Sequence, residues 1–267
     1  MKGIILIFKF MTRFPLPQIA DKNDRELGKS MKFFPLAGFG IGIFLTILAR
    51  ILGGLFPMKF ILIATILTAV EIMITGDIHL RGLTVTYDSI FRYRSRQKML
   101  DMMKDDAAIG TNGATALIFA ILFKIVLLAA ILPGFHLITL FFPVAARLNC
   151  VVNCAYVGPA RNTGKGKLFA DNTGVGDLVL SMLLTAACLA VTVFYEPRFE
   201  GYRFLLFLFL LVCVLVTMIA GYLYGYWMKK RIGGITGHTL GALVEQSEVV
   251  FLLTVFILLA GVFKGYV

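Results

Sequence analysis

The stretch from Gly76 to Gly113 carries the side chains best suited to chemistry, because it gathers charges of both signs between long apolar runs. Its ionisable residues include His79, Asp88, Arg92, Arg94, Arg96, Lys98, Lys104, Asp105 and Asp106. A polar loop of this length inside a compact chain is usually functional rather than connective. Carboxylates that approach from two sides of a loop are normal ligands of Mg²⁺, together with substrate phosphates. We therefore predict a magnesium site formed by Asp88, Asp105 and Asp106.

A second explanation of the same residues stays open. Lys98, Asp101 and Asp105 would share one face of a helix over Gln97–Asp106, because they follow one another at three- and four-residue spacing. Such a face is often a solvated stripe of ion pairs.

Two later polar segments combine glycine with charge. Ala160–Phe169 reads ARNTGKGKLF, and this composition can surround phosphate oxygens with backbone N–H groups and lysine. The spacing is not that of a Walker A motif. Gly233–Glu248 places four glycines before a helix that carries Glu245 and Glu248. These glycines permit the close approach of either a ligand or another helix.

Arg147 lies within an apolar run, where a charged side chain is costly and indicates a functional site. Pairing with a carboxylate would explain it equally well. Lys124 has a similar setting. Single histidines are more often structural, so spacing alone assigns no role to His79, His136 or His238.

The composition is that of a membrane protein. Of the 267 residues 59% are hydrophobic and the mean hydropathy is +0.87, whereas soluble domains are about 45–50% apolar. The net charge of +11 fits nucleic acid, anionic lipid or a phosphate-bearing substrate. In a membrane protein, however, the first explanation of an excess of basic residues is that they set the orientation of the chain in the membrane. We therefore predict a lipid bilayer and no nucleic acid as partner. The four cysteines lie in apolar runs and are expected to pack as small apolar residues.

The apolar runs predict an all-α, polytopic membrane bundle of about seven transmembrane helices, forming one domain over residues 1–267. The predicted spans are Phe33–Phe56, Phe60–Thr75, Ala114–Leu132, Leu137–Val157, Leu178–Tyr195, Phe204–Tyr226 and Val249–Phe263. Residues 3–14 are too short to cross a bilayer, which takes about 20 apolar residues, and indicate an amino-terminal interfacial helix.

The basic residues give this partition an orientation. Most of the 26 Lys and Arg residues fall in the amino-terminal segment and in the connections 76–113, 158–177 and 227–248. The alternate connections hold only Arg50, Lys59, Arg198, Arg203 and Lys264. The positive-inside rule therefore predicts a cytoplasmic amino terminus, with the three long polar connections on the cytoplasmic face.

Several motifs occur in the order and spacing of one family. The segments are ILIFKFMTRFPLP, FFPLAGFGIG, GDIHLRGLTVTYDSI, SRQKMLDMMKDDAAIGTNG, PVAAR, ARNTGKG and GGITGHTLGALVEQSE. Together they resemble adenosylcobinamide-GDP ribazoletransferase, the integral membrane cobalamin synthase, over nearly the whole chain. The resemblance implies a prokaryotic cell-membrane enzyme whose active face is cytoplasmic. It leaves open a homo-oligomer or an association with other cobalamin-pathway proteins.

The reaction that the resemblance implies is phosphoryl-group transfer with Mg²⁺ as cofactor. A hydroxyl of α-ribazole, or of its 5′-phosphate, attacks the cobinamide-linked phosphate of adenosylcobinamide-GDP, and GMP leaves. The matching catalytic positions are His79, Asp88, Lys104 and Asp105. The implied substrate-binding positions are Arg147, Arg161, Gly164, Lys165, Gly166, Thr236, Gly237 and Glu245. Such a transfer needs mainly positioning and neutralisation of charge.

The chain departs from the family pattern at three acidic positions, which are occupied by Arg81, Val85 and His238. We expect these substitutions in water-facing loops, where they would weaken metal binding and activity rather than stability. Two alternatives follow: a catalytically impaired relative that binds a corrinoid or a nucleotide, or a membrane phosphotransferase for another alcohol. The chain lacks the D-G-x-x-A-R signature typical of lipid head-group transferases.

Overall fold

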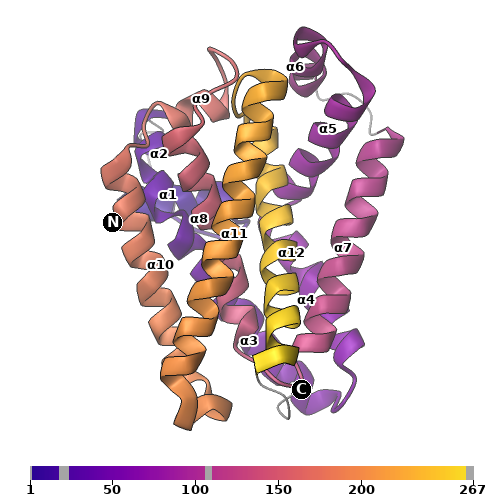
Figure 1. Ribbon diagram of the computed structural model, residues 1–267, viewed down its shortest axis with the longest axis vertical. Helices are drawn as coiled ribbons and strands as arrows, with labels where there is room; N and C mark the ends of the chain where they lie inside the picture. The colour runs from indigo at the N-terminus through magenta and orange to yellow at the C-terminus, as the bar shows by residue number, and fades with distance from the viewer. Residues whose placement is uncertain (1, 18–23, 106–109, 263–267) are drawn as a thin grey trace.

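The chain is a bundle of long helices, shown in Figure 1 by a computed structural model that describes residues 2–17, 24–105 and 110–262. The helices are α1 (Lys2–Met11), α2 (Asp24–Lys29), η1 (Ser30–Phe33), α3 (Phe34–Leu55), α4 (Phe60–Thr75), α5 (Ile78–Arg92), α6 (Arg96–Asp105), α7 (Thr111–Ile131), α8 (Ile138–Tyr156), α9 (Lys165–Ala170), α10 (Val175–Tyr195), η2 (Pro197–Tyr202), α11 (Arg203–Ile232) and α12 (Gly237–Val262). Within the described ranges, the β structure is one isolated bridge between Pro159 and Ile235.

The predicted membrane bundle is confirmed. Six helices are long and apolar enough to cross a membrane, or seven if the bent pair of α4 and α5 counts as one span. The prediction of Phe60–Thr75 as a complete span is wrong, because α4 continues into α5 across a 90° bend. The connections are also shorter than predicted: α5 and α6 occupy most of 76–113, and α11 and α12 leave only residues 233–236 between them.

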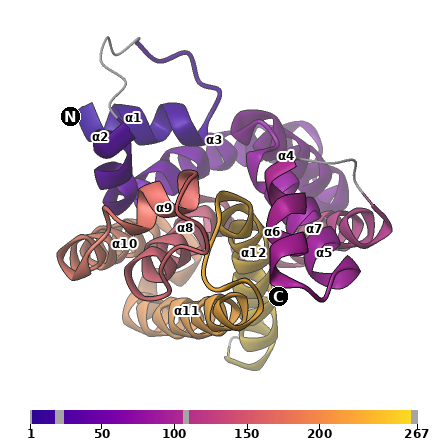
Figure 2. The same ribbon diagram turned by 90° about the horizontal axis from the view of Figure 1, so that it is seen from above.

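The helix α8 is central, and each of its residues from Ile138 to Cys154 is buried. It packs against α3, α10, α11 and α12, and Figure 2 shows α12 between α11 on one side and α5 and α7 on the other. The glycines of α3 permit this approach. A Cβ at Gly38 would lie 2.5 Å from the Pro143 carbonyl oxygen, and one at Gly42 would lie 2.1 Å from that of Leu140. These two glycines therefore let α8 approach α3 closely.

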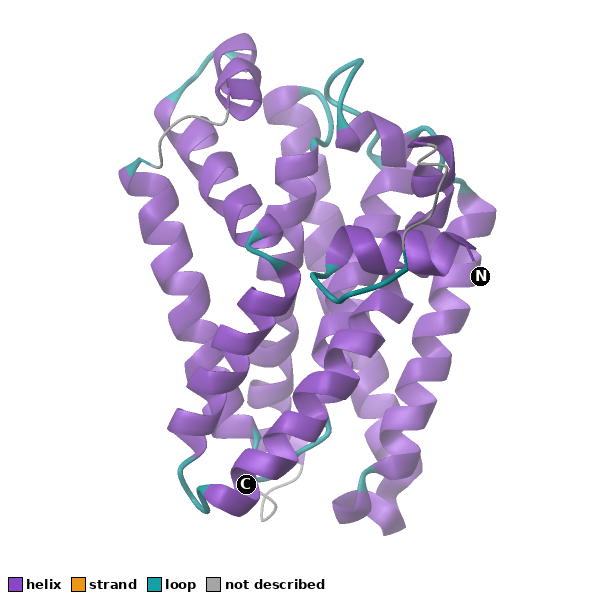
Figure 3. Ribbon diagram, turned by 180° about the vertical axis from the view of Figure 1, so that it is seen from behind, coloured by secondary structure: helices purple, strands orange, loops and turns teal. Residues whose placement is uncertain are grey.

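The amino-terminal helix α1 runs across the long helices on the flank of the bundle (Figure 3) and buries Leu6, Ile7 and Met11. The chain after it holds the α4–α5 bend. The Arg13 N–H donates to the Ile74 carbonyl oxygen at 2.7 Å, and its guanidinium donates to that of Gly76 at 3.3 Å. Gly76 has φ +64°, which favours glycine, so the bend depends on both residues.

Candidate active site: a basic pocket at one end of the bundle

A polar pocket of about 490 Å³ lies between α6 and the loop that joins α8 to α9. Its charged and polar lining consists of Arg96, Gln97, Asp101, Lys104, Arg161 and Thr163. Three cationic side chains therefore face one carboxylate. A pocket with this balance attracts anions, and arginine and lysine are the usual donors to phosphate oxygens. Of the residues predicted from sequence, the structure brings Lys104 and Arg161 together here.

Hydrogen bonds to backbone carbonyls hold the two walls of the pocket. Arg96 donates to the Ile232 carbonyl oxygen at 2.8 Å and to that of Ala160 at 3.2 Å. Arg161 Nη1 donates to the Leu100 carbonyl oxygen at 3.4 Å, whereas its buried Nε–H has no hydrogen-bond partner among the residues that the structure describes. An unsatisfied buried donor is costly, and the side chain that carries this one lines the pocket.

The predicted glycine and threonine positions form the junction between α9 and α12. A Cβ at Gly166 would lie 2.7 Å from Thr236 Cα, so this glycine permits close backbone packing. Thr236 and Thr239 cap the start of α12: the Thr239 N–H donates to Thr236 Oγ1, and the Thr236 N–H donates to Thr239 Oγ1. Gly164 has φ +91° and open space around it. Lys165 is exposed, with Nζ 3.5 Å from the Asp24 carboxylate.

Asp88 is buried and caps α7. Its two carboxylate oxygens accept the Gly110 N–H at 2.6 Å and the Gly113 N–H at 2.9 Å. A carboxylate at a helix N-terminus satisfies free N–H groups and complements the helix dipole. Of its predicted partners in a metal site, Asp106 and the side chain of Asp105 lie outside the described part of the structure.

The two motif positions upstream of Asp88 lie on the same helix. Positions 81, 85 and 88 follow one face of α5, because they are separated by four and three residues. Arg81 is exposed, but Val85 is only 5% exposed and packs in an apolar cluster with Leu100, Met103 and Ile232. The expectation of a water-facing loop is therefore wrong for Val85. Leu100 also lines the basic pocket, so position 85 lies behind its wall.

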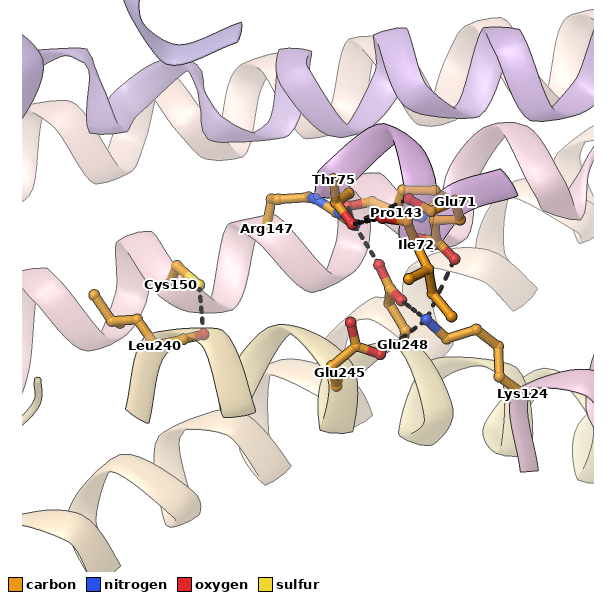
Figure 4. A network of polar contacts seen from close by, with 10 residues as sticks. All are labelled: Glu71, Ile72, Thr75, Lys124, Pro143, Arg147, Cys150, Leu240, Glu245 and Glu248. Carbon is orange, nitrogen blue, oxygen red and sulfur yellow. Dashed lines mark hydrogen bonds and ion pairs between the residues drawn. The ribbon is translucent and has the colours of Figure 1, made fainter. Parts of the chain in front are cut away.

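Arg147 and Glu245 lie in a different place, in a buried charge network that joins α4, α7, α8 and α12 (Figure 4). Lys124 Nζ on α7 is 2.5 Å from Glu248, 2.9 Å from Glu245 and 3.2 Å from Glu71. Arg147 Nη1 on α8 pairs with the other oxygen of Glu248 and also donates to the Pro143 carbonyl oxygen at 3.1 Å.

This network explains the position of Arg147 within an apolar run. Pairing with a carboxylate, one of the two explanations that the sequence left open, is confirmed. Sequence reasoning gave Lys124 little weight and assigned no role to Glu71. The available signal was the occurrence of Glu71, Lys124, Arg147 and Glu248 within or beside apolar stretches.

His79 lies at the start of α5, in the wall of a small cavity of about 40 Å³ that Lys165 and Gly237 also line. Its side chain is buried, and its Nε2 atom has no hydrogen-bond partner in the part of the chain that the structure describes. This cavity is large enough for a water molecule and is separate from the larger basic pocket.

A groove of about 510 Å³ between α5, α7 and α12 was not predicted from the sequence. Its aromatic lining is formed by Tyr87, Phe91, Phe119 and Phe123. Gln246 Nε2 donates to the Tyr87 hydroxyl at 2.5 Å and supplies a polar side. The groove reaches Asn112, next to the α7 terminus that Asp88 caps, and suits a flat apolar group.

Within the described residues, no group of three His, Cys, Asp or Glu side chains is placed to hold a metal ion. Of the three predicted ligands, the described structure supplies the side chain of Asp88 alone, and both its oxygens accept backbone N–H groups. The described residues therefore do not by themselves fit a magnesium site.

The fold and the pocket define a multi-pass helical membrane protein with a basic pocket at one end of its bundle. The sequence model of the cobalamin-5-phosphate synthase family matches residues 3–256, and the chain belongs to this family.

Relatives named adenosylcobinamide-GDP ribazoletransferase are similar over nearly their whole length. The protein of Fusobacterium nucleatum is 36% identical, with 94% of this chain and 96% of the relative covered. That of Clostridioides difficile is 34% identical, with 97% and 98% covered, and that of Acetivibrio thermocellus is 34% identical, with 96% and 98% covered. No solved structure matches the chain.

Proposed function

We propose that this chain is an adenosylcobinamide-GDP ribazoletransferase of cobalamin biosynthesis. A hydroxyl oxygen of α-ribazole, or of its 5′-phosphate, forms a bond to the cobinamide-linked phosphorus. The bond from that phosphorus to the GMP oxygen breaks, GMP leaves with the electron pair, and the hydroxyl proton is lost to the medium. The products are GMP and adenosylcobalamin, or its 5′-phosphate. Membership of the family and the names of the relatives support this reaction.

The observation that carries the proposal is that Lys104 and Arg161 line the same basic pocket. The diphosphate of adenosylcobinamide-GDP binds there, with its oxygens against the side chains of Lys104 and Arg161, which line the pocket. Lys104 is exposed, so its ammonium group can move to neutralise the negative charge that develops on the leaving GMP oxygen. Phosphoryl transfer depends on such positioning and neutralisation. Arg96 donates to two backbone carbonyl oxygens, so its role is to hold the wall of the pocket and not to bind the substrate.

Magnesium remains part of the proposal through the carboxylates of Asp88, Asp105 and Asp106. When bound, Mg²⁺ neutralises phosphate oxygens in reactions of this class. Each oxygen of Asp88 accepts one N–H and retains a lone pair, so the α7 cap and a metal contact are compatible. The site then depends on the two aspartates that follow in the chain.

The placement in the cell follows from charge. We propose that the end of the bundle with α6 and α9 faces the cytoplasm, because its connections carry most of the basic residues. The membrane is then the prokaryotic cell membrane, and soluble nucleotides reach the pocket from the cytoplasm. Self-association, or association with other cobalamin-pathway proteins, would use the exposed apolar helices and can be tested by cross-linking in native membranes.

The test is release of GMP by purified protein supplied with adenosylcobinamide-GDP, α-ribazole and Mg²⁺. We expect Mg²⁺-dependent turnover, and a fall of at least tenfold in kcat/KM for Arg161→Gln and Lys104→Gln, since each removes a charge-assisted contact worth about 1.5–3 kcal/mol. Lys98→Gln is the matched control, because Lys98 is exposed on α6 but does not line the pocket. Equal losses in all three variants would contradict the assignment of the pocket.

The impaired-relative alternative makes a different prediction for the same protein. It requires saturable binding of adenosylcobinamide-GDP, weakened by Arg161→Gln, without release of GMP. Arg81 and Val85 stand where the family pattern has carboxylates, and this departure in sequence is what motivates the alternative.

A further inference from the structure

A second large pocket, of about 520 Å³, lies at the end of the bundle opposite α6. The helix α7 separates the two ends: it begins close after α6 and runs for 21 residues, or about 30 Å, to the connection that borders this pocket. The pocket lies between the end of α3, the start of α4 and the α7–α8 connection. Neither the proposed reaction nor the sequence motifs use it.

Its walls are apolar and its rim is basic. Phe60, Ile63 and Leu132 form apolar wall, while Arg50 and His136 supply nitrogen donors. Met58 completes the rim from a backbone with φ 63°, and its side chain is 81% exposed. A non-glycine residue in this region is strained, and such strain gathers at ligand sites. The pocket thus offers one charged surface and one apolar surface to the same ligand.

Three basic groups lie near this pocket, and the carboxylate of Glu196 interacts with the charges of two of them, Arg198 and Arg50. Arg50 is exposed and makes no ion pair or hydrogen bond with the residues that the structure describes. Partial burial, and then the positive charges of Arg198 and Arg50, lower the pKa of His136, which places three basic groups in one neighbourhood. Arg198 donates to the Pro133 carbonyl oxygen in the α7–α8 connection and is thereby held beside the pocket.

The nearby acids are fewer than the basic groups, and each has partners of its own. Glu196 is fully buried, where it accepts the N–H groups of Leu137 at 3.0 Å and Arg198 at 3.4 Å. Glu200 lies 3.6 Å from Arg203. The pocket therefore keeps a positive rim, and its natural ligand is negative at one end and apolar at the other.

We propose that this pocket binds an anionic phospholipid, with its phosphate at Arg50 and His136 and an acyl chain against Phe60 and Ile63. The position at the end of the spanning helices is the depth at which a lipid headgroup meets its chains. Charge complementarity selects an anionic headgroup, as basic pockets between membrane helices do. A soluble phosphate would leave the apolar walls in contact with water. The proposal is independent of the transferase reaction.

The glycines of α3 offer a matched pair of variants for testing it. A Cβ at Gly53 or at Gly54 would meet no atom within 4 Å, so a leucine fits at either position. Gly53 lines the pocket and Gly54 does not. Gly53→Leu therefore fills the pocket without altering its charge, and Gly54→Leu controls for an added leucine at the same helix end.

The experiment is titration of the delipidated protein in neutral detergent with phosphatidylglycerol, followed by native mass spectrometry and thermal unfolding. We expect saturable binding that raises Tm and that exceeds binding of phosphatidylcholine with the same chains. Binding should weaken about fivefold in Arg50→Gln, the loss expected for one basic group near a headgroup, and at least as much in Gly53→Leu, but not in Gly54→Leu.

Three results would overturn the proposal. They are equal binding of phosphatidylcholine, unchanged binding in Gly53→Leu, and equal protection by glycerol 3-phosphate, which lacks the acyl chains. Because Gly53→Leu retains every charge, the pocket can be tested even if Arg50→Gln does not fold.

Discussion

Arg147 on α8 and Glu248 on α12 form an ion pair in which neither side chain has any exposed surface. The residues are 101 positions apart in the chain. Glu248 also accepts a hydrogen bond from Lys124, so one carboxylate joins α7, α8 and α12. Buried ions are costly to bring out of water, and a partner that is removed leaves an uncompensated charge. The pair therefore makes helix packing depend on Glu248 more than on the neighbouring carboxylates.

We predict that Glu248→Gln destabilises the protein by about 3–5 kcal/mol, as expected when a buried ion pair is broken. Glu245→Gln is the control and should cost less, because Lys124 retains Glu71 and Glu248 while the Arg147 pair is untouched. Thermal unfolding in detergent measures which of the two variants loses more stability. The combined change Arg147→Met and Glu248→Met should be milder than Glu248→Gln alone; equal Tm losses for Glu248→Gln and Glu245→Gln would contradict the prediction.

Gly113→Ala should lower stability by about 1–3 kcal/mol, the usual cost of overpacking a close contact. The added Cβ would lie 2.4 Å from Asp88 Oδ2 and 2.6 Å from the Thr84 carbonyl oxygen. Gly176→Ala on α10 is the matched control, since its Cβ meets nothing within 4 Å and should leave stability unchanged or slightly higher. The measurement is Tm, and a variant at 113 as stable as wild type would contradict the close packing of α5 on α7.

Asp88→Asn tests whether Asp88 does more than cap α7. The amide retains one acceptor oxygen, for either the Gly110 or the Gly113 N–H, and turns its NH2 donor toward the other, so we expect a stability loss of about 1–3 kcal/mol. The proposed metal contact requires the full negative charge, so GMP release should fall at least a hundredfold. Activity near that of wild type at saturating Mg²⁺ would assign Asp88 a purely structural role.

Restoring an aspartate at each of the three positions where the chain departs from the family pattern should have an effect that depends on how buried the position is. Arg81→Asp is expected to increase Mg²⁺-dependent release of GMP with little change in Tm, because position 81 is exposed. Val85→Asp should cost at least about 2 kcal/mol of stability, because it places a carboxylate in the apolar cluster around Met103. Val85→Asn controls for shape without charge, and His238→Asp completes the series. An unaltered Tm in Val85→Asp would show that position 85 is hydrated.

Glu196 predicts a pH dependence that can be measured outside the membrane spans. Burial raises the pKa of its carboxyl above the ordinary 4.5. The folded protein therefore holds this proton more tightly than the unfolded chain, and stability falls as pH rises from 4.5 through the raised pKa. Tm of wild type should decline relative to Glu196→Gln over that interval. Glu200→Gln removes an exposed carboxylate nearby and is the control; a constant difference between wild type and Glu196→Gln would contradict the prediction.

The sequence by itself determined the membrane bundle and the polar segments that border the pocket. Hydropathy is a local property, because each spanning helix satisfies its own backbone hydrogen bonds and faces lipid with its own side chains. Hydropathy did not reveal the helix α5, because hydropathy reports only local contact with lipid. Its buried face, which includes Gly82, Val85 and Ser89, packs against protein instead of lipid, so the segment is too polar to resemble a span.

Only the tertiary structure decided which distant groups meet. The pairing of Arg147 with Glu248, the capping of α7 by Asp88 and the approach of Arg161 to α6 join elements whose relative rotation is set by packing. Glycines such as Gly42 let the helices approach until side chains and carbonyls interlock, and no local pattern specifies the resulting partners. The residue types thus indicated chemistry with phosphate, and the packing decided that Lys104 and Arg161 share a pocket while Arg147 and Glu245 lie in the buried network.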